Sequence, residues 1–304
     1  MAQNLSDDKP IMFITGQNGM LGQQITQRLA GTYRIHGLTR KNNSSNNPSW
    51  NYRELLKELN FQAPDIVIHL AGAGIADKRW NQKYKQTIYE SRIQGTKWLV
   101  DEIMLFDHQP KTFVCASAIG YYGHRPNEIL DEQADKGNNF VAKVAEHWEA
   151  ATSSLKATDV RLINLRFGMI LAKNGGALKD MLLPFKLGLG GRLGDGQQQY
   201  SWISIEDVIL ILEFLINNLK CQGTYNLTSP NSVTNAQFTQ TLAKTLKRPA
   251  FMHMPAFMVR LIFGEIADEL LLADAQVLPK RLLAEGYEFK HAELQQALKY
   301  IIKG

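Results

Sequence analysis

The first residues in the chain whose spacing suits a chemical role are three glycines near the N-terminus. Gly16, Gly19 and Gly22 follow the apolar run Ile11–Ile14 and precede apolar residues at helical spacing. Between a strand and a helix, such glycines permit a tight turn, a close approach of backbone to a pyrophosphate and close packing of helix on strand. The helix N-terminus also offers N–H donors to the phosphates. We therefore predict a dinucleotide site, rather than a glycine turn without a ligand, formed by Gly16, Gln17, Asn18, Gly19, Met20, Leu21 and Gly22.

The end of the second expected strand bears on which dinucleotide would bind. An NAD site usually has an acidic residue there, about twenty residues after the glycines, that holds the ribose 2′-hydroxyl. Here the segment 36–41 contains no acid and ends in Arg40 and Lys41. The planar guanidinium of Arg40 suits a 2′-phosphate, so the sequence favours NADP(H). The alternative is that Arg40 and Lys41 are solvated loop charges.

The elements that must position these residues alternate between strand and helix. Apolar runs predict strands at Ile11–Ile14, Tyr33–Leu38, Asp65–Leu70, Thr112–Ser117 and Val160–Phe167, and helical spacing predicts helices through Leu21–Leu29, Arg79–Phe106 and Lys143–Leu155. This order is typical of an α/β protein with a Rossmann-type doubly wound parallel sheet and right-handed crossovers. The polar segment Lys41–Ser49 predicts a surface loop.

Beyond Ile170 the pattern changes. We expect a glycine-dense segment, 188–196, to form either a mobile lid or a surface loop. Helices through Val208–Leu215 and Phe238–Leu246 should cap the strand ends, and from Pro255 the pattern is almost wholly helical. We therefore expect a polar leader (1–10), a Rossmann NADP-binding domain (11–170, whose sheet could continue to about residue 228), substrate-cap segments (171–250) and a small helical C-terminal module (251–304).

Composition and charge exclude several classes of protein. With 44% hydrophobic and 21% charged residues, the chain has an ordinary globular composition. A net charge of +5 without a run of basic residues, and without a long apolar stretch, predicts no nucleic-acid or membrane partner. Two distant cysteines and scattered histidines predict neither a disulfide framework nor a metal site. We expect a cytoplasmic monomer or homodimer that binds a small-molecule substrate.

Further motifs give the chain a specific resemblance. After the glycine turn come His69-Leu70-Ala71-Gly72, Ser117-Ala118-Ile119-Gly120-Tyr121-Tyr122-Gly123, Leu165-Arg166-Phe167-Gly168 and Trp202-Ile203-Ser204-Ile205-Glu206-Asp207-Val208. In this order they resemble extended short-chain dehydrogenases/reductases and nucleotide-sugar epimerases. The segments at 75–80, 91–92, 147–149 and 183–191 look more narrowly like the "epimerase family" proteins of bacteria and organelles. The similarity covers nearly the whole chain.

The resemblance implies roles for individual residues. Leu70, Ala71 and Gly72 would lie beside the cofactor, and the Ser117 hydroxyl would hydrogen-bond a reacting alcohol or carbonyl. The position of Ser117 agrees with this, because it ends a buried strand at the edge where open α/β sheets bind ligands. A serine at such a place can also simply cap the next turn.

The helix after that serine departs from the family at large. Related enzymes carry Tyr-x-x-x-Lys there, in which the lysine lowers the tyrosine pKa and the tyrosine moves the proton that accompanies hydride transfer. Here Phe140 takes the expected tyrosine place and Val144 the lysine place. Lys143 is one position early, and aligning it with the lysine would put Asn139 at the tyrosine place. The proton-transfer site is therefore atypical.

Two phenols near Ser117 are candidates for the missing acid. Tyr121 and Tyr122 lie close to Ser117 in sequence, although packing at a strand end is an equal alternative. We therefore take Ser117, Tyr121, Tyr122 and Lys143 as candidate catalytic residues. Lys143 is also a candidate for binding the cofactor.

Two arginines are candidates for binding a substrate. Arg92 replaces the asparagine that extended members often carry, and Arg192 lies in the glycine-dense segment. Either could bind an anionic group, although basic residues usually form a solvated face. The sequence thus predicts an NADP(H)-binding epimerase or reductase acting on a small polar carbonyl or sugar-like substrate. The alternative is a catalytically degenerate NADP(H)-binding regulator that acts through a protein partner.

Overall fold

A six-stranded parallel sheet forms the centre of the computed structural model, which describes residues 9–41, 49–107 and 109–303. Its strands are β1 (Ile11–Thr15), β2 (Arg34–Leu38), β5 (Ile66–His69), β6 (Thr112–Ala118), β8 (Arg161–Phe167) and β12 (Gly223–Leu227). They lie in the order β12-β8-β6-β5-β1-β2. After β2 the chain crosses to the other side of β1, so the strand order reverses at β1. Ligands of doubly wound sheets bind at such a reversal, outside the carboxyl ends of the strands.

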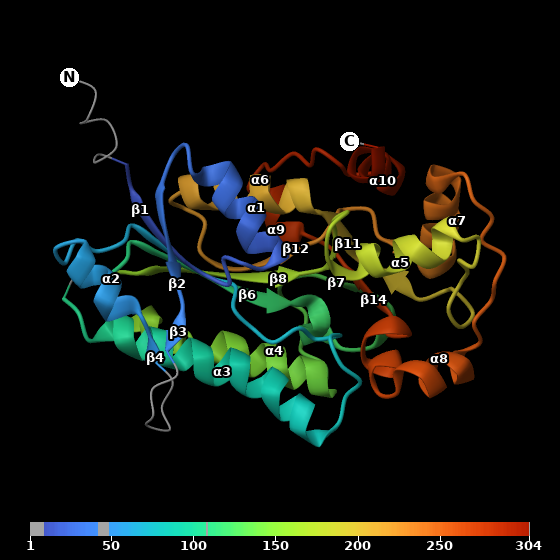
Figure 1. Cartoon of the computed structure of the whole chain (residues 1–304), viewed down its shortest axis with the longest axis horizontal. Helices are drawn as coiled ribbons and strands as arrows, with labels where there is room; N and C mark the ends of the chain where they lie inside the picture. Colours follow the sequence, from blue (N-terminus) through green and yellow to red (C-terminus); the bar gives the residue numbers. More distant parts are fainter. Residues whose placement is uncertain (1–8, 42–48, 108, 304) are drawn as a thin grey trace.

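Helices cover both faces of this sheet (Figure 1). One face carries α1 (Met20–Leu29) and α6 (Ile205–Asn217), and the other carries α2 (Tyr52–Glu58), α3 (Gln82–Met104) and α4 (Phe140–Ala150). Because both faces are covered, the central strands are apolar on both sides; the five residues of β1 are all buried. The α/β fold with a Rossmann-type doubly wound sheet is therefore confirmed.

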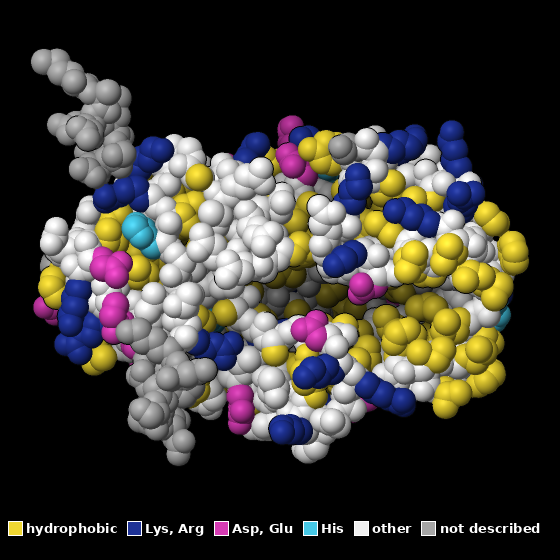
Figure 2. All heavy atoms as spheres, in the orientation of Figure 1, with side chains coloured by type: hydrophobic (Ala, Val, Ile, Leu, Met, Phe, Trp, Pro, Cys, Tyr) yellow, Lys and Arg dark blue, Asp and Glu magenta, His cyan; other side chains and the backbone are white. Residues whose placement is uncertain are grey.

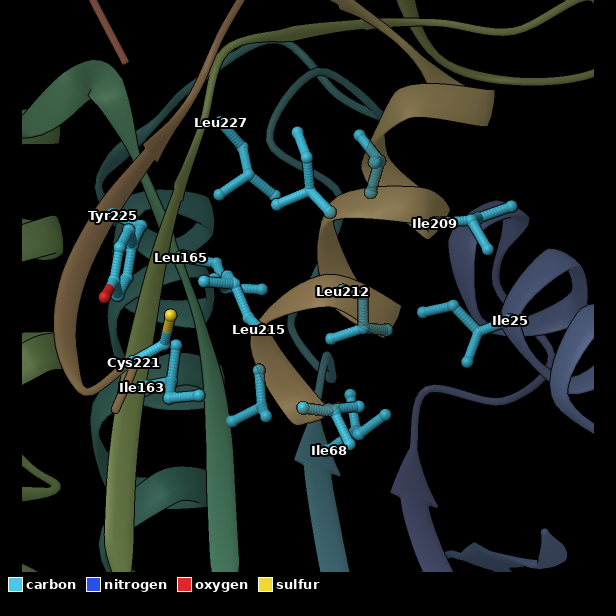
Figure 3. Packing of buried hydrophobic residues seen from close by; sticks show 14 of the residues in the cluster. Ile25, Ile68, Ile163, Leu165, Ile209, Leu212, Leu215, Cys221, Tyr225 and Leu227 are labelled. Carbon is cyan, nitrogen blue, oxygen red and sulfur yellow. The ribbon is translucent and has the colours of Figure 1, made fainter. Parts of the chain in front are cut away.

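The helix α6 and the strand β12 return the chain to the sheet. Figure 3 shows Leu212 and Leu215 of α6 packed between Ile25 of α1 and Ile163 of β8, and all four side chains are buried. Burying such a side chain typically contributes about 1.5–3 kcal/mol. The helix expected through Val208–Leu215 thus packs on one face of the sheet, beside α1, and does not cap the strand ends. The strand β12 pairs with β8 as the sixth strand.

A second region lies beyond the carboxyl ends of the strands. Its elements are β9 (Met169–Leu171) paired with β11 (Trp202–Ser204), β10 (Gln199–Tyr200) paired with β13 (Val233–Thr234), and the helices α5 (Gly176–Lys186), α7 (Asn235–Leu246) and α10 (Leu294–Lys303). Phe185 of α5, Phe238 of α7 and Leu298 of α10 share one buried cluster. Segments far apart in sequence therefore build a single cap.

The C-terminal module is only partly helical. It contains α8 (Ala256–Phe263), a π-helical turn (Ala267–Leu271), β14 (Ala275–Val277) and α9 (Lys280–Ala284) before α10. The strand β14 pairs with β7 (Arg125–Leu130), a pairing that the sequence analysis did not anticipate because a three-residue strand shows no periodicity. This pairing joins the module to the segment that follows Ser117.

Shorter elements complete the chain. Two 3₁₀ turns, Ile119–Tyr122 and Ser153–Ala157, flank α4, and β3 (Arg40–Lys41) pairs with β4 (Ser49–Trp50). Most of the surface loop expected at 41–49 lies outside the described residues. The helix expected from Lys143 begins at Phe140, because the side chain of Asn139 caps it by accepting a hydrogen bond from the Ala142 N–H.

Candidate functional site

The glycine turn lies at the carboxyl end of β1 and has little room for side chains. Gly16 has φ +71°, and a Cβ there would come within 3.2 Å of the Leu70 backbone. A Cβ on Gly22 would come within 2.2 Å of the Gly16 carbonyl oxygen, so only glycine lets α1 pack this close to the turn. A Cβ on Gly19, in contrast, would meet only the Gly16 oxygen, at 3.2 Å. The outer side of Gly19 is therefore open to a ligand.

The first turn of α1 offers free N–H groups beside that opening. Its N-cap, Gly19, provides no side-chain cap, and the first turn contains no acid. Such a helix start suits a pyrophosphate, because the first N–H groups of a helix have no partner within it. Among the neighbouring predicted residues, Gln17 lies along Gly37 of β2, and Met20 lies against Gly175 before α5. Leu21 packs on the core, whereas Asn18 is exposed.

A buried hydrogen-bond network holds the next strand end against this turn. The Thr15 hydroxyl oxygen accepts hydrogen bonds from the N–H groups of Leu70 (3.0 Å) and Ala71 (3.1 Å). With both lone pairs used, Thr15 donates its own proton to His69 Nδ1 at 2.8 Å. His69 Nε2 then carries the ring proton and donates to the Thr96 hydroxyl at 2.9 Å. Burial lowers the pKa of His69 to about 3, so its ring is neutral.

Arg40 lies just beyond β2, on the side of the sheet expected to face the adenosine part of a dinucleotide. Its side chain is exposed, with the guanidinium carbon 5.6 Å from the centre of the Trp50 ring. Trp50 is fixed by a 2.8 Å hydrogen bond from its indole N–H to the Gly95 carbonyl. Arg40 forms no ion pair with any described residue, so its guanidinium is available to an anion.

Ser117 lies at the carboxyl end of β6 and is 3% exposed. Its hydroxyl donates a 2.7 Å hydrogen bond to Glu149 Oε1 of α4. Arg166 of β8 holds the same carboxylate with two bonds, Nε to Oε1 at 2.7 Å and Nη2 to Oε2 at 2.8 Å. This buried, bidentate pair fixes Glu149 and thereby orients the serine.

The structure separates the two tyrosines that follow Ser117. Tyr122 is fully buried; its hydroxyl donates to Asn226 at 2.8 Å and accepts from Arg166 at 3.0 Å. Burial raises the pKa of Tyr122 to about 12, although the Arg166 cation opposes this. Tyr121 is half-buried, and the guanidinium carbon of Arg166 lies 3.4 Å from its ring centre. Tyr121 is thus the phenol of the pair that is not enclosed.

The face of α4 that reaches Ser117 is apolar apart from Glu149. One and two turns before Glu149 on this face stand Ala145 and Val141, both buried. Phe140 packs on Trp80, with ring centres 5.2 Å apart. Lys143 is exposed on the other side of the helix, so the structure does not bring it to Ser117. No phenol and no lysine of α4 approaches the serine.

Arg92 is a largely buried cation without an acidic partner among the described residues. It donates to the carbonyls of Ala73 (2.9 Å) and Ile88 (3.2 Å) and lies 5.1 Å from the ring centre of Trp148. Its side chain runs along Gly72, where a Cβ would come within 3.2 Å of the guanidinium carbon. Burial lowers the pKa of Arg92 to about 10, which leaves it charged at neutral pH. It lies where a ligand beside Gly72 would meet it.

Arg192 faces a different space. It lines a cavity of about 640 Å³ together with His124, His253 and Arg260, between the glycine-dense segment and the C-terminal module. Two backbone hydrogen bonds fix the glycine-dense segment here. Met252 N–H donates to Gly190 O at 3.2 Å, and Met254 N–H donates to Arg192 O at 3.0 Å. The cavity does not include Ser117 or the glycine turn, so the structure does not bring Arg192 to the other candidates.

Several residues that shape this site were not singled out from the sequence. Glu149 and Arg166 were noted only as parts of motifs, and Thr15, Thr96 and Trp148 act through His69 or beside Arg92. The one available signal was that Arg166 is a charged residue inside an otherwise apolar strand, which requires a buried partner. No cluster of residues able to hold a metal occurs among the described parts of the chain.

The fold and this site define a Rossmann-type dinucleotide-binding protein of the extended short-chain dehydrogenase/reductase type. Residues 12–228 match the NAD dependent epimerase/dehydratase family, and residues 254–301 match a domain of unknown function (DUF1731). The chain is 34% identical to the epimerase family protein ML0860 of Mycobacterium leprae, over 96% of this chain and 95% of that protein. The chain belongs to the NAD dependent epimerase/dehydratase family.

Solved structures agree with this assignment. The human epimerase family protein SDR39U1 (isoform 2), crystallised with NADPH, matches 96% of this chain and 99% of its own length with a TM-score of 0.87 and 32% identity. A nucleoside-diphosphate sugar epimerase from Corynebacterium glutamicum matches 97% of this chain and 58% of its own length, with a TM-score of 0.76 and 29% identity. No helix in the described part of the chain is both long and apolar enough to cross a membrane.

Proposed function

We propose that this protein is an NADP(H)-dependent reductase or epimerase that acts on a small polar carbonyl or sugar-like substrate. The observation that carries the proposal is that three strand ends meet at the reversal of the sheet. The open glycine turn follows β1, the Leu70–Gly72 backbone follows β5, and Ser117 is the last residue but one of β6. A nicotinamide held along the first two would lie next to the serine. The sugar-like substrate is supported by the similarity to the Corynebacterium glutamicum sugar epimerase.

The preference for NADP(H) over NAD rests on Arg40. It stands beyond β2 without an acidic partner among the described residues and without an acid nearby to hold a ribose 2′-hydroxyl. A 2′-phosphate would supply the missing anion. The crystal structure of the human relative with NADPH supports the same preference.

Ser117 and its partners determine which groups accept and donate the proton that accompanies hydride transfer. A bound dinucleotide would supply the hydride transfer itself. Because Ser117 donates its proton to Glu149, its oxygen is oriented to accept a hydrogen bond from a substrate hydroxyl. Tyr121, held over Arg166, is the accessible phenol that could donate to a carbonyl oxygen. These two residues would together take the place of the tyrosine and lysine that α4 lacks.

The buried cation of Arg92 indicates that the substrate or cofactor carries an anionic group at this place. A desolvated guanidinium without a carboxylate partner is costly, and an anion beside Gly72 would remove much of that cost. We propose that Arg92 binds a phosphate or carboxylate next to the reacting centre. Arg192, which lies in the separate 640 Å³ cavity, would contact only a more distant part of a large substrate.

The experiment is a screen of carbonyl compounds, sugar nucleotides and quinones for NADPH oxidation, followed in absorbance, with Ser117→Ala as the control. Turnover that disappears in Ser117→Ala but survives in Lys143→Gln, an exposed position on α4, supports the proposal. Turnover unchanged in Ser117→Ala would place the chemistry elsewhere.

One observation favours a second function, that of an NADP(H)-binding regulator without turnover. Apart from Glu149, which Arg166 holds in an ion pair, the face of α4 that reaches Ser117 carries Val141 and Ala145, which cannot transfer protons. If NADPH binds tightly and no compound in the screen is reduced, the better description is a protein that reports NADP(H) to a protein partner.

A further inference from the structure

Large hydrophobic side chains are exposed together at the end of the molecule formed by α5, α7 and α8. The apolar end surface consists of Leu183, Leu187, Leu189, Phe251, Met252, Phe257, Met258, Leu261 and Ile262. Leu187 is 65% exposed, Phe251 77% and Leu261 72%. Figure 2 shows hydrophobic side chains gathered over the end of the molecule to the right, where Figure 1 places α5, α7 and α8. Exposed apolar patches of this kind mark binding surfaces.

The apolar end surface is held in place by backbone contacts. Gly191 packs so closely on Met252 that a Cβ would collide with the Met252 carbonyl, and Met252 N–H donates to Gly190 O at 3.2 Å. These contacts hold the segments that carry Leu189 and Phe251 next to each other. In α8, Val259 is fully buried and anchors the helix, while Phe257 and Leu261 point outward. The surface therefore exists before any partner arrives.

The unpaired charge near the apolar end surface is mostly positive, because the exposed acids after α8, Glu265 and Asp268, are paired with Lys85 and Arg260. Five exposed cations lie on α5, on α7 or directly after α7, and none forms an ion pair with a described residue: Lys179, Lys186, Lys244, Lys247 and Arg248. Within residues 176–192 and 235–264, the only acid is Asp180. Figure 2 shows Lys and Arg side chains along the upper border of the hydrophobic area. A partner for this end must therefore be apolar within and anionic around.

Although the sequence alone predicts no membrane partner, we propose that the apolar end surface docks on the face of an anionic phospholipid bilayer. Exposed Phe and Leu side chains would enter the interface, and the bordering cations would contact lipid phosphates, as in other peripheral proteins. Each Lys or Arg near such a surface contributes roughly fivefold in binding, from about 1 kcal/mol. A second copy of the chain is a poorer occupant, because a symmetric pairing of this surface would bring the same cations together.

The test is flotation of the purified protein with vesicles of phosphatidylcholine alone or mixed with phosphatidylglycerol. We expect binding only to the anionic vesicles, and weaker binding at high salt because the charges become screened. The double variant Phe257→Ser/Leu261→Ser and the double variant Lys186→Gln/Arg248→Gln should each reduce binding at least tenfold. Leu105→Ser and Leu219→Ser are the matched controls, since these side chains are 81% and 79% exposed on other segments.

The outcomes separate this proposal from its alternatives. Equal binding to neutral and anionic vesicles, or no binding to either, would overturn it. Light scattering that shows a dimer without lipid, lost in Phe257→Ser/Leu261→Ser, would assign the apolar end surface to a second copy instead. Because all four substitutions are at exposed positions, unchanged thermal unfolding would show that a lost interaction is not a lost fold.

Discussion

Ser117 and Glu149, which are separated by 32 residues in sequence, share a 2.7 Å hydrogen bond in which the serine is the donor. The Glu149 side chain is 14% exposed and is held by Arg166, whose own side chain is 5% exposed. The serine proton therefore points toward a fixed carboxylate. This relationship makes Ser117 an acceptor for a substrate hydroxyl and assigns proton donation to another group.

The first prediction concerns Ser117 and Tyr121, the phenol that we propose as the proton donor. Ser117→Ala and Tyr121→Phe should each depress turnover by about a hundred- to ten-thousand-fold once a substrate is known, while the affinity for NADPH changes little. The reason is that both side chains would contact the reacting oxygen and neither forms part of the glycine turn. Steady-state kinetics and NADPH fluorescence titration measure the two quantities separately.

Tyr122→Phe is the control for this prediction. Its hydroxyl is enclosed between Asn226 and Arg166, so the loss should reduce the free energy of unfolding by about 1–3 kcal/mol, measured in urea. Turnover should fall far less than in Tyr121→Phe. The opposite order of effects would show that Tyr122 is the catalytic phenol.

A second prediction concerns the choice of cofactor. Arg40→Ala should weaken NADPH binding by about 1.5–3 kcal/mol and leave NADH binding nearly unchanged, because only NADPH offers a 2′-phosphate to the guanidinium. Titrations of both cofactors against both proteins measure the difference. If the parent protein binds the two cofactors equally, Arg40 has no part in selection.

The glycine turn gives a third prediction with a built-in control. Gly22→Ala should abolish dinucleotide binding or unfold α1, since the new Cβ would lie 2.2 Å from the Gly16 oxygen. Gly31→Ala, where an added Cβ would meet nothing within 4 Å beyond its own chain neighbours, should change neither stability nor binding. Circular dichroism and NADPH titration follow both variants. A Gly22→Ala protein with normal affinity would contradict the packing described for the turn.

The fourth prediction is a dependence of stability on pH that comes from His69. Its pKa is lowered from 6.5 to about 3 by burial, so between these values the unfolded chain binds a proton that the folded protein does not. Stability should therefore fall with acidification below pH 6.5, by about 1.4 kcal/mol per pH unit from this group. Protonation would also place a donor at Nδ1 against Thr15, whose oxygen already accepts two hydrogen bonds.

The measurement is urea unfolding of the parent protein and of His69→Asn at several pH values between about 7.5 and 4.5, a range that covers roughly the upper two pH units of the interval between the unfolded and folded pKa values. The stability advantage of the parent should shrink as the pH falls, because asparagine does not titrate. An advantage that stays constant with pH would mean that His69 is protonated in the folded protein.

Much of the fold follows from local patterns in the sequence. The buried strands from Ile11 to Phe167 are apolar runs, and the glycine turn is a contiguous motif between strand and helix, so both could be predicted from neighbouring residues. The confirmed family follows from the same local motifs. Short strands could not be predicted from neighbouring residues. The strand β14, for example, is three residues long and forms only because β7 lies beside it.

Only the tertiary structure decided which side chains meet. Phe140, Lys143 and Val144 lie within five residues of one another in the sequence. In the structure, however, α4 is oriented so that Glu149 faces Ser117 and Lys143 faces solvent. Likewise, the cations of α5 and α7 are never a run in the sequence, yet the cap brings them to one apolar end. Helix orientation and long-range packing set these neighbours, and no spacing rule within a single segment encodes them.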